Sequence, residues 1–247
     1  MSRRGAVLIA LAASAAALAP VTGASPQRYT PATPSIAPVP MSASCRPEAA
    51  ADVDLGAAWL LVRAPVAARP AFDRAVDHDP DCALGYWGQA LVRFDEAAAG
   101  APGAVAAVEA TIARALAVPA RTPFERAAVG ALARLRTREA APGVPAAWPA
   151  RLAAYRDALC AEAASDRGVR LWCARALADS WTPSSTGLAA VAGPAVTALD
   201  HVVELARTQP LDVGAALIAL DVAPDPRAPI VTRALATIAA ANPPAVA

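Results

Sequence analysis

Asp77, Asp79 and Asp81 alternate along one short segment of the chain. Alternating carboxylates of this kind open the calcium-binding loop of an EF-hand, which also needs a glycine at its sixth position and a glutamate at its twelfth. This chain has Cys82 and Gly88 at those two positions. The segment is therefore interpreted as a solvated turn, in which the Asp81 carboxylate caps the start of the next helix.

The two histidines offer little for metal or acid–base chemistry. His78 stands at the end of a predicted helix, where a positive charge interacts favourably with the helix dipole. His201 lies within a predicted helix and has no acidic or cysteine partner at ligand spacing. The sequence also lacks a Cys-x-x-Cys pair, a nucleophile elbow, a phosphate loop and a dinucleotide fingerprint. We therefore predict no catalytic residues, no bound metal and no cofactor.

The glutamates are scattered along the chain rather than paired. Four of them are each expected on a solvated helix face: Glu125, Glu139, Glu162 and Glu204. Carboxylates from distant helices can still meet in a groove and act as a general acid and a general base. Sequence spacing leaves that possibility open.

The elements that hold these residues are predicted to be helices. Of the 247 residues, 56% are hydrophobic, and many of these are alanine, which has the highest helix propensity. The 24 prolines cluster between the apolar runs, where they separate helices. The fold class is therefore predicted to be all-α. A net charge of +1, with no basic run beyond Arg3-Arg4, argues against nucleic-acid binding.

The first 44 residues have the pattern of an export signal followed by a linker. In residues 1–24, two arginines precede an apolar stretch of about fourteen residues, and small residues then provide a cleavage site. That stretch is shorter than the ~20 residues that span a membrane, although an uncleaved N-terminal anchor stays open. Residues 25–44 carry prolines among small polar residues and are predicted to be a disordered linker. We expect a periplasmic or secreted protein with no membrane contact beyond the signal peptide.

From Pro47 the chain reads as about ten helices in consecutive hairpins, joined by loops rich in proline, glycine, serine and threonine. The first helix, for example, carries Leu55, Trp59 and Val62 on one face. The predicted helices cover residues 48–63, 66–78, 82–97, 103–117, 123–138, 147–164, 167–179, 194–208, 211–221 and 227–241. Residues 45–247 are therefore predicted to form one helical domain.

The first hairpin resembles a tetratricopeptide repeat (TPR), a helix–turn–helix unit of about 34 residues. The matching positions, in order and spacing, are Gly56, Trp59, Ala68, Phe72, Ala75 and Pro80. In such a repeat the small residues Gly56 and Ala68 allow the two helices to cross closely, and Phe72 fills the space between helices. The resemblance implies an α-solenoid of about five TPR-like hairpins.

More closely, the chain is similar to a group of secreted bacterial TPR proteins. The shared segments are Ser44-Cys45, the Asp-Pro-x-Cys-Ala-x-x-Tyr-Trp-Gly run over residues 79–88, and the Thr-x-x-Glu run from Thr122 to Glu125. The similarity extends over roughly residues 44–243. Relatives usually continue with a histidine-rich helix pair, but residues 215–221 of this chain contain no histidine. A metal or catalytic role that depends on those histidines is therefore not carried over.

The resemblance implies a non-catalytic scaffold or a module that binds a protein or peptide. Stacked repeats form a concave surface from the first helix of each hairpin, and five residues there are predicted to contact the partner: Arg63, Gln89, Arg93, Arg134 and Arg175. Trp148 and Trp181, in or beside loops, are further candidates. Two alternatives remain: an enzyme or accessory subunit with a site on the concave face, and a structural domain that only dimerises.

Export also implies disulfides, since an even number of cysteines in an oxidising compartment usually pairs. Cys45 precedes the first helix of one repeat and Cys82 begins the first helix of the next, so both lie at the same end of the predicted stack. We predict that the N-terminal segment folds over to join them. Cys160 and Cys173 can bridge across the intervening turn or remain buried thiols, and the sequence leaves this open.

Overall fold

The computed structural model describes residues 36–136, 139–141, 144–145, 147–179, 194–208, 212–222 and 229–241. The predicted signal peptide, residues 25–35 of the predicted linker and Trp181 lie outside these ranges.

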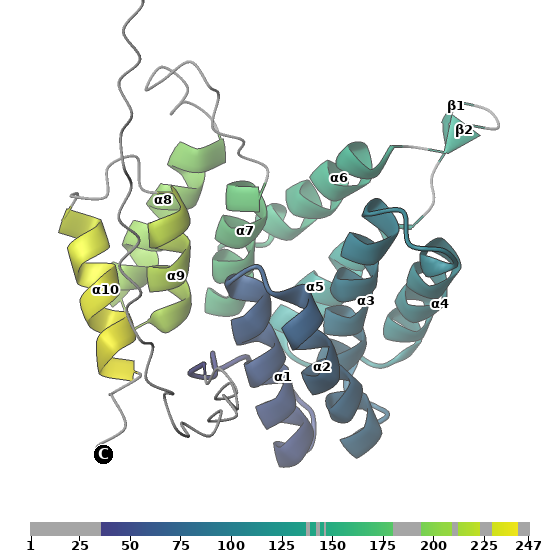
Figure 1. Ribbon diagram of the computed structural model, residues 1–247, viewed down its shortest axis with the longest axis horizontal. Coiled ribbons are helices and arrows are strands. Elements are labelled where there is room, and N and C mark those ends of the chain that lie inside the picture. The colour runs from purple at the N-terminus through teal and green to yellow at the C-terminus, as the bar shows by residue number, and fades with distance from the viewer. Residues whose placement is uncertain are drawn as a thin grey trace, which may run out of the picture. The chain divides into compact units, whose positions relative to one another are not determined.

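The described part of the chain is helical, which confirms the predicted fold class (Figure 1). The helices are α1 (Pro47–Leu61), α2 (Pro65–His78), α3 (Ala83–Ala98), α4 (Ala104–Ala117), α5 (Pro123–Leu132), α6 (Trp148–Ala161), α7 (Arg167–Asp179), α8 (Pro194–Thr208), α9 (Val213–Val222) and α10 (Pro229–Ala241). One short antiparallel pair, β1 (Glu139–Ala141) with β2 (Val144–Pro145), lies between α5 and α6. The largest boundary difference is in α5, which was predicted to continue to residue 138.

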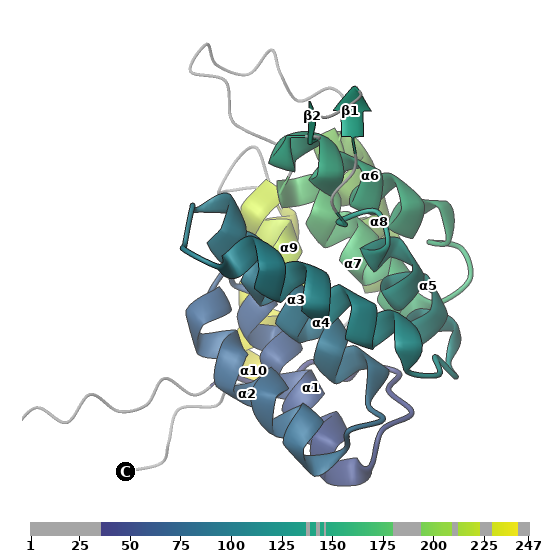
Figure 2. The same ribbon diagram turned by 90° about the vertical axis from the view of Figure 1, so that its right-hand side faces the viewer.

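Consecutive helices pack in pairs: α1 with α2, α3 with α4, α5 with α6, α7 with α8, and α9 with α10. The odd-numbered helices also contact one another in chain order, from α1 through α3, α5 and α7 to α9. α1 contacts α9 as well. Figure 2 shows α3 alongside α4, with α1 and α2 below them. The odd-numbered helices therefore bring together residues that are far apart in the sequence.

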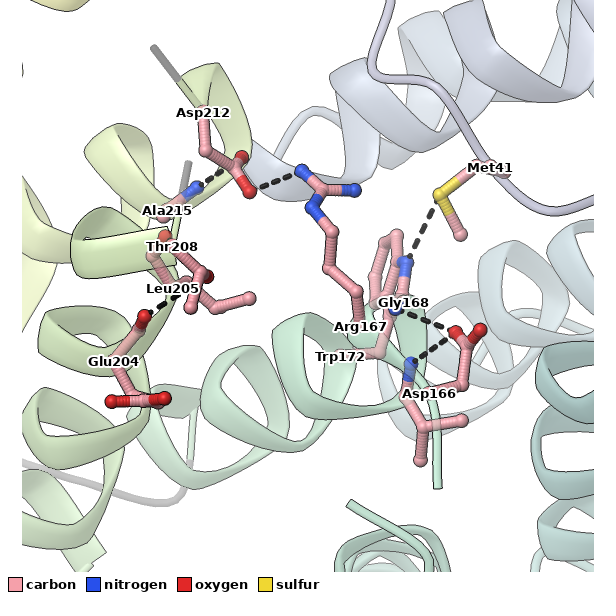
Figure 3. Close-up of polar contacts among 11 residues, drawn as sticks. Met41, Asp166, Arg167, Gly168, Trp172, Glu204, Leu205, Thr208, Asp212 and Ala215 are labelled. Carbon is pink, nitrogen blue, oxygen red and sulfur yellow. Dashed lines mark hydrogen bonds and ion pairs between the residues drawn. The ribbon is translucent and has the colours of Figure 1, made fainter. Parts of the chain in front are cut away.

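Most helix starts, those of α3 and α4 excepted, have a proline or an acidic or hydroxyl side chain that accepts backbone N–H groups. The Asp166 carboxylate accepts the N–H of Gly168 at 2.7 Å at the start of α7, and Asp212 accepts the N–H of Ala215 at 3.0 Å at the start of α9 (Figure 3). Arg167 forms an ion pair with Asp212, which ties these two helix starts together.

Two predictions about local structure were wrong. The residue before α3 is Cys82, with no side-chain cap, and the Asp81 carboxylate does not cap this helix. Instead, the Asp81 N–H donates to the Asp79 carboxylate at 3.1 Å, so Asp79 organises the turn. Pro70 lies inside α2 rather than between helices.

Phe72 of α2 is the side chain around which the first three helices pack. It is fully buried, and a Cβ atom added at Gly56 of α1 would lie 2.7 Å from Cζ of its ring. A Cβ atom added at Gly88 of α3 would lie closer still. Glycine is therefore required at both positions, because any side chain would occupy the space of the Phe72 ring. Ala68 is also fully buried, consistent with a close approach between α1 and α2.

The segment before α1 packs against the helices, although residues 25–44 were predicted to be disordered. Val39 is buried, and the Met41 N–H donates to the Asp54 carboxylate of α1 at 2.7 Å. The Ser42 carbonyl accepts the Thr122 hydroxyl at 2.7 Å. Residues 36–44 form neither helix nor strand, because proline and small residues disfavour a helix, but these contacts give them a defined position. We call residues 36–46 the N-terminal segment.

Both pairs of cysteines form disulfides. Cys45 is joined to Cys82, with the Cα atoms 4.8 Å apart, which is the pairing predicted from the sequence. Cys160 at the end of α6 is joined to Cys173 of α7, with a Cα separation of 4.9 Å. The sequence had left the second pair open. It forms because α6 and α7 pack together and bring the two cysteines within bridging distance.

Candidate functional site

The three sequence segments that carry the resemblance meet where the N-terminal segment joins the helices. Glu125 of α5 is fully buried and accepts hydrogen bonds from the N–H groups of Ser44, Arg121 and Thr122 at 2.6, 2.7 and 2.9 Å. Its carboxylate also accepts the Ser44 hydroxyl. The Asp79 carboxylate accepts the N–H of Arg46 at 2.8 Å. These residues hold the N-terminal segment in place.

The prediction that Glu125 faces solvent was therefore wrong. Burial alone raises the pKa of the Glu125 carboxyl, but the hydrogen bonds from Ser44, Thr122 and Arg121 outweigh it and hold the pKa below its ordinary value. The charged form is the one these donors stabilise. Glu125 therefore serves as an anchor, with its oxygens already occupied by the chain's own donors.

A pocket of about 470 Å³ lies between the turn from α1 to α2 and the helices α3, α6 and α7. Its walls are mostly apolar or aromatic, and its polar groups are two arginines, two aspartates and a tyrosine. The lining residues are Leu60, Arg63, Pro65, Leu91, Phe94, Asp95, Leu152, Tyr155, Trp172, Arg175, Ala176 and Asp179. An apolar cavity with a few converging polar groups is the usual form of a ligand site.

The aromatic side chains that line this pocket pack against, and hydrogen-bond to, residues outside it. The Trp172 ring packs edge-on against Trp87, with the ring centroids 4.7 Å apart. The indole N–H of Trp87 donates to the Tyr155 hydroxyl at 3.2 Å. The indole N–H of Trp172 is directed at the Met41 sulfur, 3.4 Å away in the N-terminal segment (Figure 3). The pocket wall is therefore connected to the segment that the Cys45–Cys82 disulfide secures.

Two arginines and two aspartates form a charge cluster at one end of the pocket. The guanidinium of Arg175 is almost fully buried and donates to Asp179 at 2.6 Å, to Asp221 of α9 and to the Leu61 carbonyl. Arg63 lies 3.3 Å from Asp179 and 3.6 Å from Asp221. These contacts link the end of α1 and the turn after it with α7 and α9. The two positive and two negative charges balance, so the cluster carries no net charge.

Asp95 is the remaining charged residue of the pocket and has a different environment. Asp95 is exposed to solvent where it lines the pocket, yet its partial burial raises the pKa of the carboxyl to about 6, and the nearby charge of Asp179 adds to the shift. Among the described residues, no hydrogen-bond donor or cation contacts the Asp95 side chain. The pocket therefore contains one carboxylate whose charge is uncompensated.

Two of the five predicted binding residues, Arg63 and Arg175, line this pocket. Gln89 and Arg93 lie instead in a small surface hollow between α2 and α3, where Gln89 donates to an aspartate of α2 at 2.8 Å. Arg134 lines a separate, more polar hollow between α5 and α6. The structure thus brings together only part of the predicted set.

The sequence interpretation missed the residues that give the pocket its character, among them Phe94, Asp95 and Tyr155. One feature of the pocket could have been found from the sequence. Arg175 and Asp179 are four residues apart on one helix, the spacing of an ion pair, and they form that pair in the structure. Trp148, a predicted surface candidate, instead packs against Phe94, with the ring centroids 4.9 Å apart.

The described ranges contain no group of three or more His, Cys, Asp or Glu side chains placed to hold a metal ion. None of their helices combines the length and apolar character needed to cross a lipid bilayer.

Comparisons with protein-family models, with curated proteins and with solved structures find no match for this chain. Membership of the TPR family therefore stays a prediction from the residue pattern.

Proposed function

We propose that this protein is an exported, non-catalytic binding module with a TPR-like α-solenoid fold, and that its pocket holds part of a protein or peptide partner. The observation that carries the proposal is the open pocket of about 470 Å³ lined by α3, α6, α7 and the turn after α1. Its volume falls within the range of ligand pockets and is sufficient for one or two side chains.

The packing around Phe72 supports the TPR-like assignment. A helical repeat needs small residues where neighbouring helices cross and a large residue between them. Gly56 and Gly88 lie 32 positions apart, on successive odd-numbered helices, and both face the Phe72 ring. The contacts of the odd-numbered helices with one another agree with a stack in which these helices form one surface.

The disulfides support export. Cys45–Cys82 and Cys160–Cys173 account for all four cysteines. Structural disulfides persist in oxidising compartments such as the bacterial periplasm or the extracellular space. The two bridges therefore support a periplasmic or secreted location.

The enzyme alternative has one observation in its favour. A carboxyl whose pKa is raised to about 6, as at Asp95, is suited to general acid–base work near neutral pH. Its neighbour Asp179, however, is held in ion pairs with Arg63 and Arg175. A second reactive group free to work with Asp95 is therefore not evident in the described part of the pocket, and binding accounts for the geometry more simply.

A peptide array with randomised sequences, probed with the exported protein with both disulfides intact, tests this function. Leu152→Trp places a large ring in the pocket, whereas Leu116→Trp places the same ring on α4, outside the pocket. We expect the array to contain peptides that bind both the unmodified protein and the Leu116→Trp variant but do not bind the Leu152→Trp variant. If Leu152→Trp folds normally by circular dichroism and binds the same peptides equally well, the pocket is not the binding site.

A further inference from the structure

We propose that the pocket receives a basic side chain, lysine or arginine, of the bound peptide, and that the Asp95 carboxylate is the partner of its charge. This inference rests on the proposed function and specifies the chemistry of the ligand. It follows from the charges that line the cavity and from the character of the walls.

The balance of charge selects the sign of the ligand. Arg63 and Arg175 are neutralised by Asp179 and Asp221, at N–O distances of 3.3 Å for Arg63–Asp179 and 2.6 Å for Arg175–Asp179. An anionic ligand would have to compete with these carboxylates for the charge of the guanidiniums. Asp95 is left without a counter-charge among the described residues. A cation is therefore the ligand group that completes the pocket, whereas a carboxylate or phosphate would lie near a like charge.

The walls suit the remainder of a basic side chain. Lysine and arginine carry apolar stems that bury against hydrophobic surface while the charged group keeps a polar partner. Leu91 lies one helical turn before Asp95 on α3, and both line the pocket. The Trp172 ring lines it as well, and aromatic rings attract a cation near their faces, whereas the Phe94 ring already has the Arg151 guanidinium 5.7 Å from its centroid. A lysine or arginine whose stem packs against Leu91 and whose charged group lies near Asp95 contacts both the apolar wall and the carboxylate.

The pH dependence of binding follows from the groups around Asp95. Arg63 at the α1–α2 turn, Tyr155 on α6 and the pair Arg175–Asp179 on α7 line the same pocket, and Asp221 of α9 completes their charge cluster. The pKa of Asp95 is raised to about 6, so the carboxyl is charged above this pH and neutral below it. Affinity for a basic peptide should therefore be highest above pH 6 and fall as the pH drops through it.

The experiment compares peptides that bind in the pocket with versions in which each lysine becomes norleucine and each arginine becomes citrulline. These replacements keep the stem and remove the charge. We expect affinity to fall about tenfold or more with the neutral peptides, in line with loss of a hydrogen bond to a charged group. Asp95→Asn should weaken the basic peptides by a similar factor and abolish their pH dependence. Asp77→Asn, a carboxylate of α2 outside the pocket, is the matched control and should leave both unchanged.

The outcomes separate this inference from the proposed function. Peptides that require the pocket, by the Leu152→Trp criterion, but bind equally well without a positive charge overturn the cation proposal and leave the binding function standing. Unaltered affinity for basic peptides in Asp95→Asn overturns it as well. If no peptide requires the pocket, the proposed function and this inference both fail.

Discussion

Replacing Gly88 with alanine tests the packing on which the helical arrangement depends. Gly88 lies on α3, and the added Cβ atom would overlap three atoms of the Phe72 ring. The ring is fully buried and packs edge-on against Trp87, with centroids 6.3 Å apart, so it has little room to move. Overpacking of this kind costs about 1–3 kcal/mol, and we expect the upper end because the obstacle is a rigid ring.

A gain in helix propensity opposes this cost. Glycine inside a helix is about 1 kcal/mol less favourable than alanine, so the net loss for Gly88→Ala should be about 2 kcal/mol. Gly130 in α5 provides the matched control, because no atom lies within 4 Å of a Cβ built there. Gly130→Ala should therefore stabilise the protein, by up to about 1 kcal/mol.

Urea unfolding, followed by circular dichroism with the disulfides intact, measures both variants. The direction in which the urea concentration of unfolding changes tests the described packing. If Gly88→Ala unfolds at the same or a higher urea concentration than the unmodified protein, the Phe72 ring does not occupy the space beside Gly88, and the packing of α2 on α3 is incorrectly described.

Three further predictions concern the same domain. Ala68→Leu should overpack the crossing of the first two helices and destabilise by about 1–3 kcal/mol, which an unchanged melting temperature would contradict. Because the pKa of Glu125 is lowered in the folded state, its contribution to stability is present above the unfolded value and is lost as the pH falls through the folded one. Glu125→Gln should therefore destabilise at neutral pH and show a smaller loss of stability in acid, as measured by urea unfolding at several pH values. Replacing Cys45 and Cys82 together with alanine should cost about 2–4 kcal/mol, and mass spectrometry of an unreduced digest identifies the bridge directly.

The sequence by itself determined the helical class and most helix boundaries. Proline before a helix and alanine within it act on the local backbone, so their effects do not depend on distant residues. α7 was predicted over residues 167–179 and α8 over residues 194–208, and both have those bounds. The pairing of Cys45 with Cys82 was also predictable, because each lies at a helix start and successive odd-numbered helices are neighbours.

Only the tertiary structure decided the pocket and its charges. Arg63 and Asp221 form an ion pair although 158 positions separate them, and their meeting depends on the contact of α1 with α9. Periodicity identifies the apolar face of a helix, but not which distant helix will cover it. For the same reason Glu125 was expected to face solvent, since its burial depends on Ser44, more than eighty positions earlier. The uncompensated charge of Asp95 likewise results from the way α3 packs with α6 and α7 around the pocket, which no local pattern in the sequence records.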